Sequence, residues 1–136
     1  MISIDNIKRI EKMAYPDGYV MFSYMDDIED LSTEYCDDDE YLDILSAKDS
    51  YMIITISKNK NKMYIVDYAS LNPIGGSGII KQFLKKYKGY KVSCDARKST
   101  SYPILKKLHK KKLIKIRLDV KSEEFDDERY VVFKVK

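Results

Sequence analysis

The order of secondary-structure signals after residue 51 is the feature that most constrains the fold of this 136-residue chain. Two β-favouring runs come first, helix and strand signals then alternate, and two alternating runs end the chain, which gives the order β-β-α-β-α-β-β. A strand-helix-strand unit implies a right-handed parallel crossover, and the terminal pair implies antiparallel edges. We therefore predict an α/β fold with a mixed central sheet and helices on both faces.

The individual elements follow from periodicity and from breaking residues. Gly89 ends the first of the two helices in this region, and Pro103 is tolerated in the first turn of the second. The expected strands are residues 51–57, 63–68, 90–94, 114–120 and 130–135, and the expected helices are residues 77–87 and 99–108.

Residues 1–50 form the N-terminal segment of the same single domain, 1–136, and residues 51–135 form its core. Apolar residues at helical spacing predict a helix from Asp5 to Ala14. Pro16-Asp17-Gly18 predicts a turn, and Tyr19 to Tyr24 is a β-favouring run. The stretch 26–47 holds ten acidic residues and no Lys or Arg, and it is compatible with one or two short helices or with a draped loop.

A glycine-rich segment connects the second expected strand to the first helix of the core. It runs from Leu71 to Gly78 as LNPIGGSG, with Ser77 as the expected N-cap of the helix. Glycines let backbone N–H groups approach an anion closely, and a helix N-terminus adds donors and a positive dipole end. The segment is therefore a candidate phosphate cradle, and the alternative is a connection that only turns a strand into a helix.

Together these segments resemble the core of the GNAT acyltransferases over roughly residues 51–135. Met63 to Tyr68 is similar to the strand that carries acyl-CoA along its edge, and residues 72–78 resemble a shortened pyrophosphate loop. Residues 90–95 resemble the strand that splays away from it to admit the pantetheine arm, and residues 101–113 resemble the helix that follows.

The resemblance implies acetyl-CoA as co-substrate and an amine, on a small molecule or a protein, as acceptor. It assigns the cofactor to seven residues: Tyr68, Ala69, Ser70, Gly75, Gly76, Ser77 and Gly78. Two departures indicate a degenerate member. The Gln or Arg that the family usually places before the glycines is missing, and Leu108 stands where a tyrosine often serves as general acid.

Acetyl transfer from a thioester requires a base for the amine and a proton donor for the leaving thiolate. Asp67 is the candidate base because it interrupts the apolar run MYIVDY, and its alternative is an outward-facing strand carboxylate. Tyr102 is the candidate acid, with Tyr68 as a second choice, and both are also compatible with ordinary packing. The sequence predicts no metal site.

Two other functions remain open. The first is a GNAT-shaped protein-interaction module without catalysis, whose surface would be the Tyr- and Asp-rich segment 19–45. The second is a nucleic-acid binder, because residues 81–117 carry fourteen basic residues and one acidic residue. Neither a signal-peptide core nor a transmembrane run is recognisable, so we expect a cytoplasmic protein that does not enter the membrane. A homodimer is a further possibility that the sequence leaves open.

Overall fold

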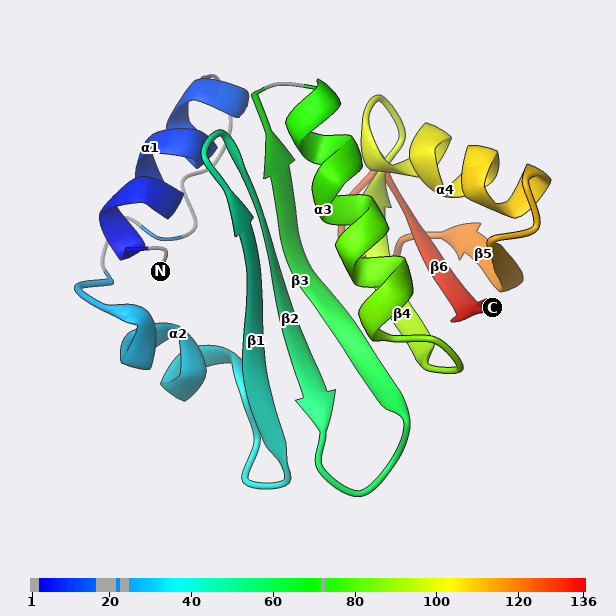
Figure 1. Cartoon of the computed structure of the whole chain (residues 1–136), viewed down its shortest axis with the longest axis horizontal. Helices are drawn as coiled ribbons and strands as arrows, with labels where there is room; N and C mark the ends of the chain where they lie inside the picture. Colours follow the sequence, from blue (N-terminus) through cyan, green and yellow to red (C-terminus); the bar gives the residue numbers. More distant parts are fainter. Residues whose placement is uncertain (1–2, 17–21, 23–24, 72) are drawn as a thin grey trace.

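Six strands form one mixed sheet in the order β1-β2-β3-β4-β6-β5 (Figure 1). The computed structural model describes residues 3–16, 22, 25–71 and 73–136, and only the backbone of residues 73–77. Within these residues β3 and β4 are parallel, and every other neighbouring pair is antiparallel. The strands are β1 (Glu40–Ala47), β2 (Ser50–Ser57), β3 (Lys62–Ser70), β4 (Lys91–Arg97), β5 (Ile114–Lys121) and β6 (Glu128–Val135).

Four described helices cover the two faces of this sheet, as the sequence predicts. They are α1 (Ile4–Ala14), α2 (Ile28–Tyr35), α3 (Pro73–Lys86) and α4 (Ser101–Lys110). The pair α1 and α2 packs on one face, and the pair α3 and α4 packs on the other. None of the described helices combines the length and apolar character needed to cross a membrane.

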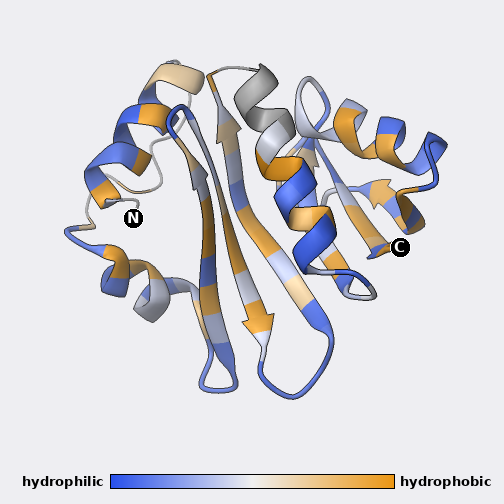
Figure 2. Ribbon diagram, in the orientation of Figure 1, coloured by the Kyte–Doolittle hydropathy of each residue, from blue (hydrophilic) through white to orange (hydrophobic). Residues whose placement is uncertain are grey.

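Alternation along β2 builds both apolar cores. Tyr51 and Ile53 point toward α1 and α2, whereas Met52, Ile54 and Ile56 point toward α3 and α4. Successive side chains of a strand face opposite sides of a sheet, so a strand buried on both faces reads as the continuous apolar run seen here. Figure 2 shows that α1, α3 and α4 are amphipathic, since each carries both hydrophobic and hydrophilic bands.

The N-terminal segment agrees with the sequence prediction only in part. The helix expected from Asp5 to Ala14 is α1, which Ser3 caps by accepting a hydrogen bond from the Asn6 amide. The acidic stretch contains one short helix, α2, and also the strand β1, which we did not expect. The β-favouring run Tyr19 to Tyr24 lies outside the described residues except for Phe22, which is buried.

The predicted start of the helix after β3 is wrong. The sequence places a loop from Leu71 to Gly78 with Ser77 as N-cap, but α3 begins at Pro73. Proline suits the first helical position because its fixed φ is helical and its missing N–H would lack an intrahelical partner there. The glycines therefore lie in the first turns of the helix instead of in a loop before it.

Candidate active site

The two central strands separate soon after they begin. β3 pairs with β4 only where Lys62 to Tyr64 lie beside Lys91 to Ser93. Beyond this point the two parallel strands diverge, while β3 stays paired with β2 and β4 stays paired with β6. The sheet is therefore open between Ile65–Ser70 and Cys94–Arg97.

A β-bulge in β3 lies at this opening. Ile53 of β2 faces Asp67, but the next residue, Ile54, faces Ile65, so Val66 is an extra residue in β3. Bulges bend a strand and redirect side chains, and they are common beside functional sites. Here the bulge brings Val66 and Asp67 to the face covered by α1 and α2, where Val66 packs in the apolar core and Asp67 contacts Tyr51.

A cavity of about 530 Å³ occupies the opening between β3 and β4. Its volume is within the usual range for small-molecule sites. Toward α3 and α4 the lining is mostly apolar: Met52, Ile65, Tyr68, Ile80, Cys94, Ala96, Ser101, Ile104 and Leu105. Toward α1 and the β5–β6 turn it is polar and aromatic: Tyr15, Tyr35, Tyr64, Val66, Asp67, Asp95, Arg97, Glu124, Phe125, Asp127 and Glu128.

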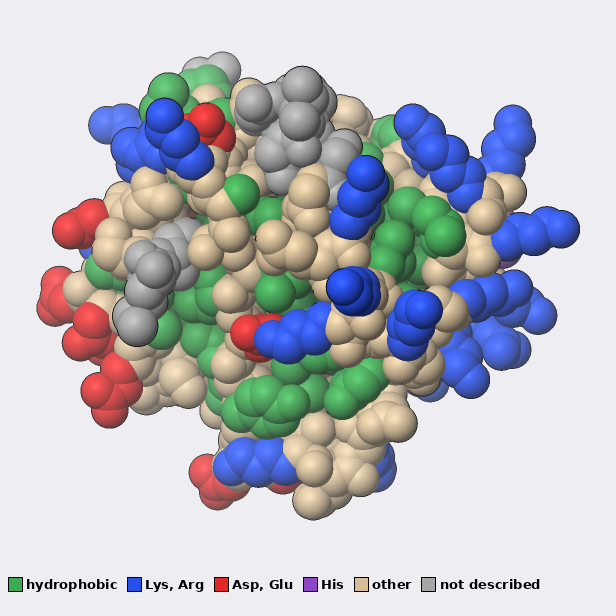
Figure 3. All heavy atoms as spheres, in the orientation of Figure 1, with side chains coloured by type: hydrophobic (Ala, Val, Ile, Leu, Met, Phe, Trp, Pro, Cys, Tyr) green, Lys and Arg blue, Asp and Glu red, His purple; other side chains and the backbone are tan. Residues whose placement is uncertain are grey.

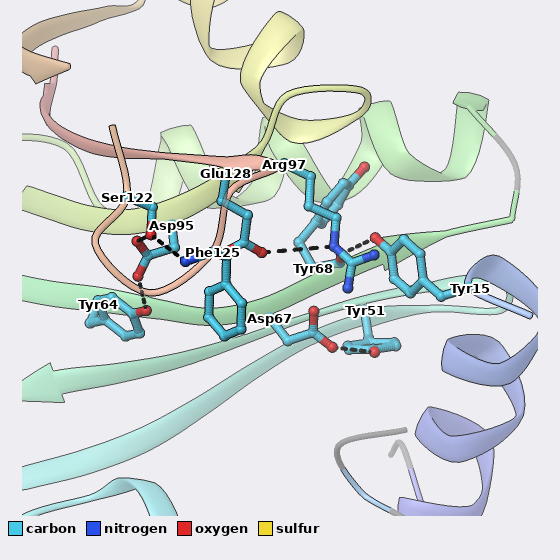
Figure 4. Close-up of polar contacts among 10 residues, drawn as sticks. All are labelled: Tyr15, Tyr51, Tyr64, Asp67, Tyr68, Asp95, Arg97, Ser122, Phe125 and Glu128. Atoms are coloured by element: carbon cyan, nitrogen blue, oxygen red, sulfur yellow. Dashed lines mark hydrogen bonds and ion pairs between the residues drawn. The ribbon is translucent and has the colours of Figure 1, made fainter. Parts of the chain in front are cut away.

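Asp67, the base predicted from the sequence, lies on the polar side of this cavity (Figure 4). Its Oδ2 accepts a hydrogen bond of 2.5 Å from the hydroxyl of the buried Tyr51. Burial raises the pKa of Asp67, while the Tyr51 hydroxyl and the Arg97 guanidinium act in the opposite direction. A carboxylate with a raised pKa is better matched to proton transfer near neutral pH than an ordinary aspartate.

Arg97 and Tyr15 meet at the end of the cavity where β4 ends. The guanidinium carbon of Arg97 lies 3.7 Å from the centre of the Tyr15 ring. The Tyr15 hydroxyl donates a hydrogen bond of 3.0 Å to the Tyr68 carbonyl of β3. Burial and the charge of Asp67 raise the pKa of Tyr15 to about 12, so this hydroxyl stays protonated and remains a donor.

Glu128 adds a second carboxylate with an unusual environment. Its Oε1 lies 4.0 Å from Arg97 Nε, and its Oε2 is buried with no hydrogen-bond partner among the described residues. Burial and the neighbouring charge of Asp95 raise the pKa of Glu128 to about 7. This carboxyl group therefore titrates at a higher pH than an ordinary glutamate.

The turn between β5 and β6 is anchored to the cavity wall by Asp95. One carboxylate oxygen of Asp95 accepts from Tyr64 at 2.9 Å and the other accepts from Ser122 at 3.0 Å. The Ser122 oxygen in turn accepts from the amides of Glu124 and Phe125. These bonds hold the half-exposed Phe125 ring against the cavity, as Figure 4 shows.

Tyr102, the acid predicted from the sequence, is not among the described residues that line the cavity. Its hydroxyl donates a hydrogen bond of 2.5 Å to Asp119 of β5, which also forms an ion pair with Arg129. The structure therefore does not bring Tyr102 together with Asp67. It does place Tyr68, the second choice, on the apolar side of the cavity.

The residues predicted to bind the cofactor follow one another along β3 and into α3. Tyr68 lines the cavity, whereas the Ala69 side chain is fully buried toward α1 and Ser70 ends the strand opposite Ser50. Gly75, Gly76, Ser77 and Gly78 fall within α3. In a helix that begins at Pro73, the first-turn amides that need an external acceptor are those of residues 74 and 75, so Gly76, Ser77 and Gly78 lie past this group.

Other reactive side chains do not compete for a role in this site. Cys94 is buried as predicted, and burial raises its pKa to about 12, which keeps the thiol protonated. Within the described part of the chain, no group of three or more His, Cys, Asp or Glu side chains is placed to hold a metal ion.

A mixed sheet that opens around a cavity between two parallel central strands is the architecture of the GNAT acetyltransferases, and this chain has the GNAT fold. The fold class predicted from the sequence is therefore confirmed. No family model and no curated protein matches the sequence.

Solved structures carry the comparison instead. The chain is similar to the aminoglycoside 6'-N-acetyltransferase from Enterococcus faecium, with a TM-score of 0.58 and 8% identity over 96% of this chain and 88% of that one. The ribosomal-protein-S18-alanine N-acetyltransferase from Escherichia coli gives 0.59 and 10% over 96% and 84%. An aminoglycoside 6'-acetyltransferase type Ii gives 0.60 and 10% over 97% and 88%.

Proposed function

We propose that this protein is an N-acetyltransferase that binds acetyl-CoA and transfers the acetyl group to an amine. The observation that carries the proposal is the divergence of β3 from β4 around a cavity that reaches both faces of the sheet. A reaction between two substrates requires a site where both can approach from different sides, and this opening provides one.

The side of the cavity toward α3 and α4 suits the acetyl-CoA. Its lining is mostly apolar, which fits the pantetheine arm. The edge of β3 at Tyr68 to Ser70, which β4 does not pair with, leads toward the start of α3. The N-terminus of a helix attracts phosphate. Lys and Arg side chains also gather over α3 and α4 in Figure 3, which favours the approach of a polyanionic cofactor from this side.

The polar side of the cavity suits the amine and the proton transfers. Asp67 takes a proton from the ammonium group, and the neutral nitrogen then attacks the thioester carbonyl. The C–N bond forms and the C–S bond breaks, so the electron pair of the C–S bond leaves on sulfur as the CoA thiolate, and the nitrogen loses its second proton to become the neutral amide. Tyr68 lines the apolar side, and we assign to it the donation of a proton to the thiolate, which the second proton lost by the nitrogen then replaces.

Acetyl-CoA binding tests the proposal directly. If acetyl-CoA is present at 100 times its dissociation constant, binding to the native state adds about 2.7 kcal/mol to the free energy of unfolding, which raises Tm by several degrees. Isothermal titration calorimetry should give one site per chain. Gly76→Asp places a negative charge in the first turn of α3 and should weaken this binding at least tenfold.

The other outcomes distinguish the remaining functions. Neither a Tm shift nor a calorimetric signal with acetyl-CoA would contradict the proposal and would favour the interaction module. Binding of acetyl-CoA without thiol release in the presence of any amine would favour a degenerate protein that retains the cofactor site. Unchanged affinity in Gly76→Asp would contradict the placement of the phosphates at α3.

A further inference from the structure

We infer that the acceptor is a small amine that carries at least two positive charges, as a diamine or polyamine does. This inference deepens the proposed function by naming the class of amine that the polar side of the cavity would recognise. It depends on the charges that line this side, on their different depths, and on the partly enclosed shape of the site.

The charge of the cavity differs from the charge of the chain. The chain as a whole has a formal net charge of +3. Five carboxylates nevertheless line the described part of the cavity, against a single cation, Arg97. Arg97 is already committed, because it stacks on Tyr15 and pairs with Glu128. An excess of negative charge in a partly enclosed site attracts a cation and repels an anion.

These carboxylates lie at two depths. Asp67 lies in the sheet beside the buried Tyr51, and as the proposed base it marks the position of the reacting nitrogen. Glu124 and Asp127 are exposed on the β5–β6 turn at the rim, and the half-buried Glu128 that follows them has a buried Oε2 without a hydrogen-bond partner among the described residues. A single ammonium group can satisfy only one of these levels, so an acceptor with two charges fits the arrangement better.

Mutual repulsion among these carboxylates supports the same conclusion. The pKa of Glu128 rises to about 7 through burial, then through the charges of Asp95, Asp127 and Glu124. A cation placed among them would relieve that repulsion and lower this pKa again. Cation binding at pH 7 should therefore release protons, which is a measurable consequence that does not depend on catalysis.

The shape and the aromatic lining favour a small acceptor. The cavity is about 530 Å³, and the acetyl group and the end of the pantetheine arm must share it, which leaves room for only a short chain. Tyr64 and Phe125 line its polar side, and aromatic faces attract ammonium groups. The anionic cofactor is disfavoured here by the carboxylates, so the two substrates are sorted to opposite sides of the opening.

Calorimetry without acetyl-CoA tests the inference apart from the proposed function. The probe is 1,4-diaminobutane, and n-butylamine is the matched monoamine. The diamine should bind at least about tenfold more tightly, a difference of about 1.4 kcal/mol. Titrations in buffers of different ionisation enthalpy should show proton release at pH 7. Raising the salt concentration should weaken the binding of the diamine more than that of the monoamine.

Variants at the rim separate the cavity from general surface charge. Glu124→Gln combined with Asp127→Asn changes two exposed side chains and should retain the fold while it removes most of the preference for the diamine. Glu128→Gln should abolish the proton release. Glu29→Gln, an exposed acid on α2 outside the cavity lining, is the control and should bind the diamine as the wild type does.

Equal affinities for the diamine and the monoamine would overturn the inference, and so would an undiminished preference for the diamine in the rim variant. Acetyl-CoA titrations separate this failure from failure of the proposed function. A protein that binds acetyl-CoA without preferring the diamine remains an acetyltransferase candidate with another acceptor. A protein that binds the diamine but not acetyl-CoA retains the cation site and loses the proposed activity.

Discussion

Arg97 of β4 lies over the ring of Tyr15, the C-cap residue of α1, with the guanidinium carbon 3.7 Å from the ring centre. Tyr15 also donates a hydrogen bond to the Tyr68 carbonyl on β3. One tyrosine therefore links β3 and β4 at the end where the two strands do not pair. Because this link runs through the Tyr15 side chain and not through strand pairing, its strength can be changed without altering the sheet.

Tyr15→Phe should lower the free energy of unfolding by about 1 kcal/mol, since it removes one hydrogen bond and retains the ring that Arg97 covers. Tyr15→Ala removes the ring as well and should cost about 2 kcal/mol more. Urea denaturation followed by far-UV circular dichroism measures both values. A Tyr15→Phe variant as stable as the wild type would show that the hydroxyl contributes nothing to closing this end of the cavity.

Tyr51→Phe should raise the pKa of Asp67. The Tyr51 hydroxyl donates to the carboxylate and so stabilises its charged form, which partly offsets the effect of burial. Without this donor the charged form of Asp67 is less stable relative to the protonated form, so the pKa of Asp67 rises. Titration of the Asp67 carboxyl carbon by NMR in a ¹³C-labelled protein measures the shift in both proteins. A pKa that is unchanged or lower would contradict the role given to Tyr51.

The core of the fold was predictable because its elements carry simple periodic signals. The continuous apolar run of β2 and the alternation of Val92 and Cys94 in β4 indicate strands, and the strand-helix-strand order fixes a parallel neighbour. β1 escaped prediction because Asp43 interrupts its apolar pattern. The structure explains why a charged residue is tolerated there. Asp43 accepts a hydrogen bond from Tyr87 and forms an ion pair of 2.9 Å with Lys86, the last residue of α3.

Of the candidate site, the sequence identified Asp67 and Tyr68 but none of their neighbours. Tyr15, Arg97 and Glu128 come from three distant segments, and only the packing of α1 and the pairing of β4 with β6 bring them together. The bulge at Val66 has no glycine to mark it. The acidic β5–β6 turn is typical of a solvated turn, and only its anchoring to Asp95 makes it part of the cavity.

Tyr68→Phe and Tyr102→Phe should separate a proton donor from a packing residue. Tyr68 lines the cavity, so its loss should lower kcat for thiol release from acetyl-CoA by about 10²-fold. The Tyr102 hydroxyl is bonded to Asp119 outside the cavity lining, so its loss should change kcat less than about twofold. Release of CoA thiol, followed with a chromogenic disulfide, measures both. The reverse order of effects would restore Tyr102 as the acid.

Gly78→Ala and Gly89→Ala should change stability in opposite directions. A Cβ added at Gly78 meets no atom within 4 Å, and alanine favours a helix over glycine, so Gly78→Ala should stabilise the protein by about 0.5–1 kcal/mol. Gly89 has a φ of +84°, which costs an L-residue about 1–2 kcal/mol, so Gly89→Ala should destabilise it. Chemical denaturation compares the two variants. Destabilisation by Gly78→Ala would contradict the helical start of α3.

Glu128→Gln should change how stability depends on pH. The pKa of Glu128 is raised to about 7 by burial and by Asp95, above an ordinary value of about 4.3 in the unfolded chain. Between these values the native state binds more protons than the unfolded state, so this residue's contribution to stability is complete below pH 4 and is lost as pH rises toward 7. The glutamine variant has no such group and should not show this loss.

The difference in unfolding free energy between Glu128→Gln and the wild type should therefore move in favour of the variant by about 1 kcal/mol between pH 4.5 and 7.5, after allowance for screening of a carboxylate that retains solvent contact. Urea denaturation at several pH values measures it. Glu123→Gln, an exposed acid on the same turn, is the control and should follow the wild type. A constant difference across this range would mean that Glu128 titrates as an ordinary surface glutamate, and that the carboxylates around it do not repel one another in the cavity.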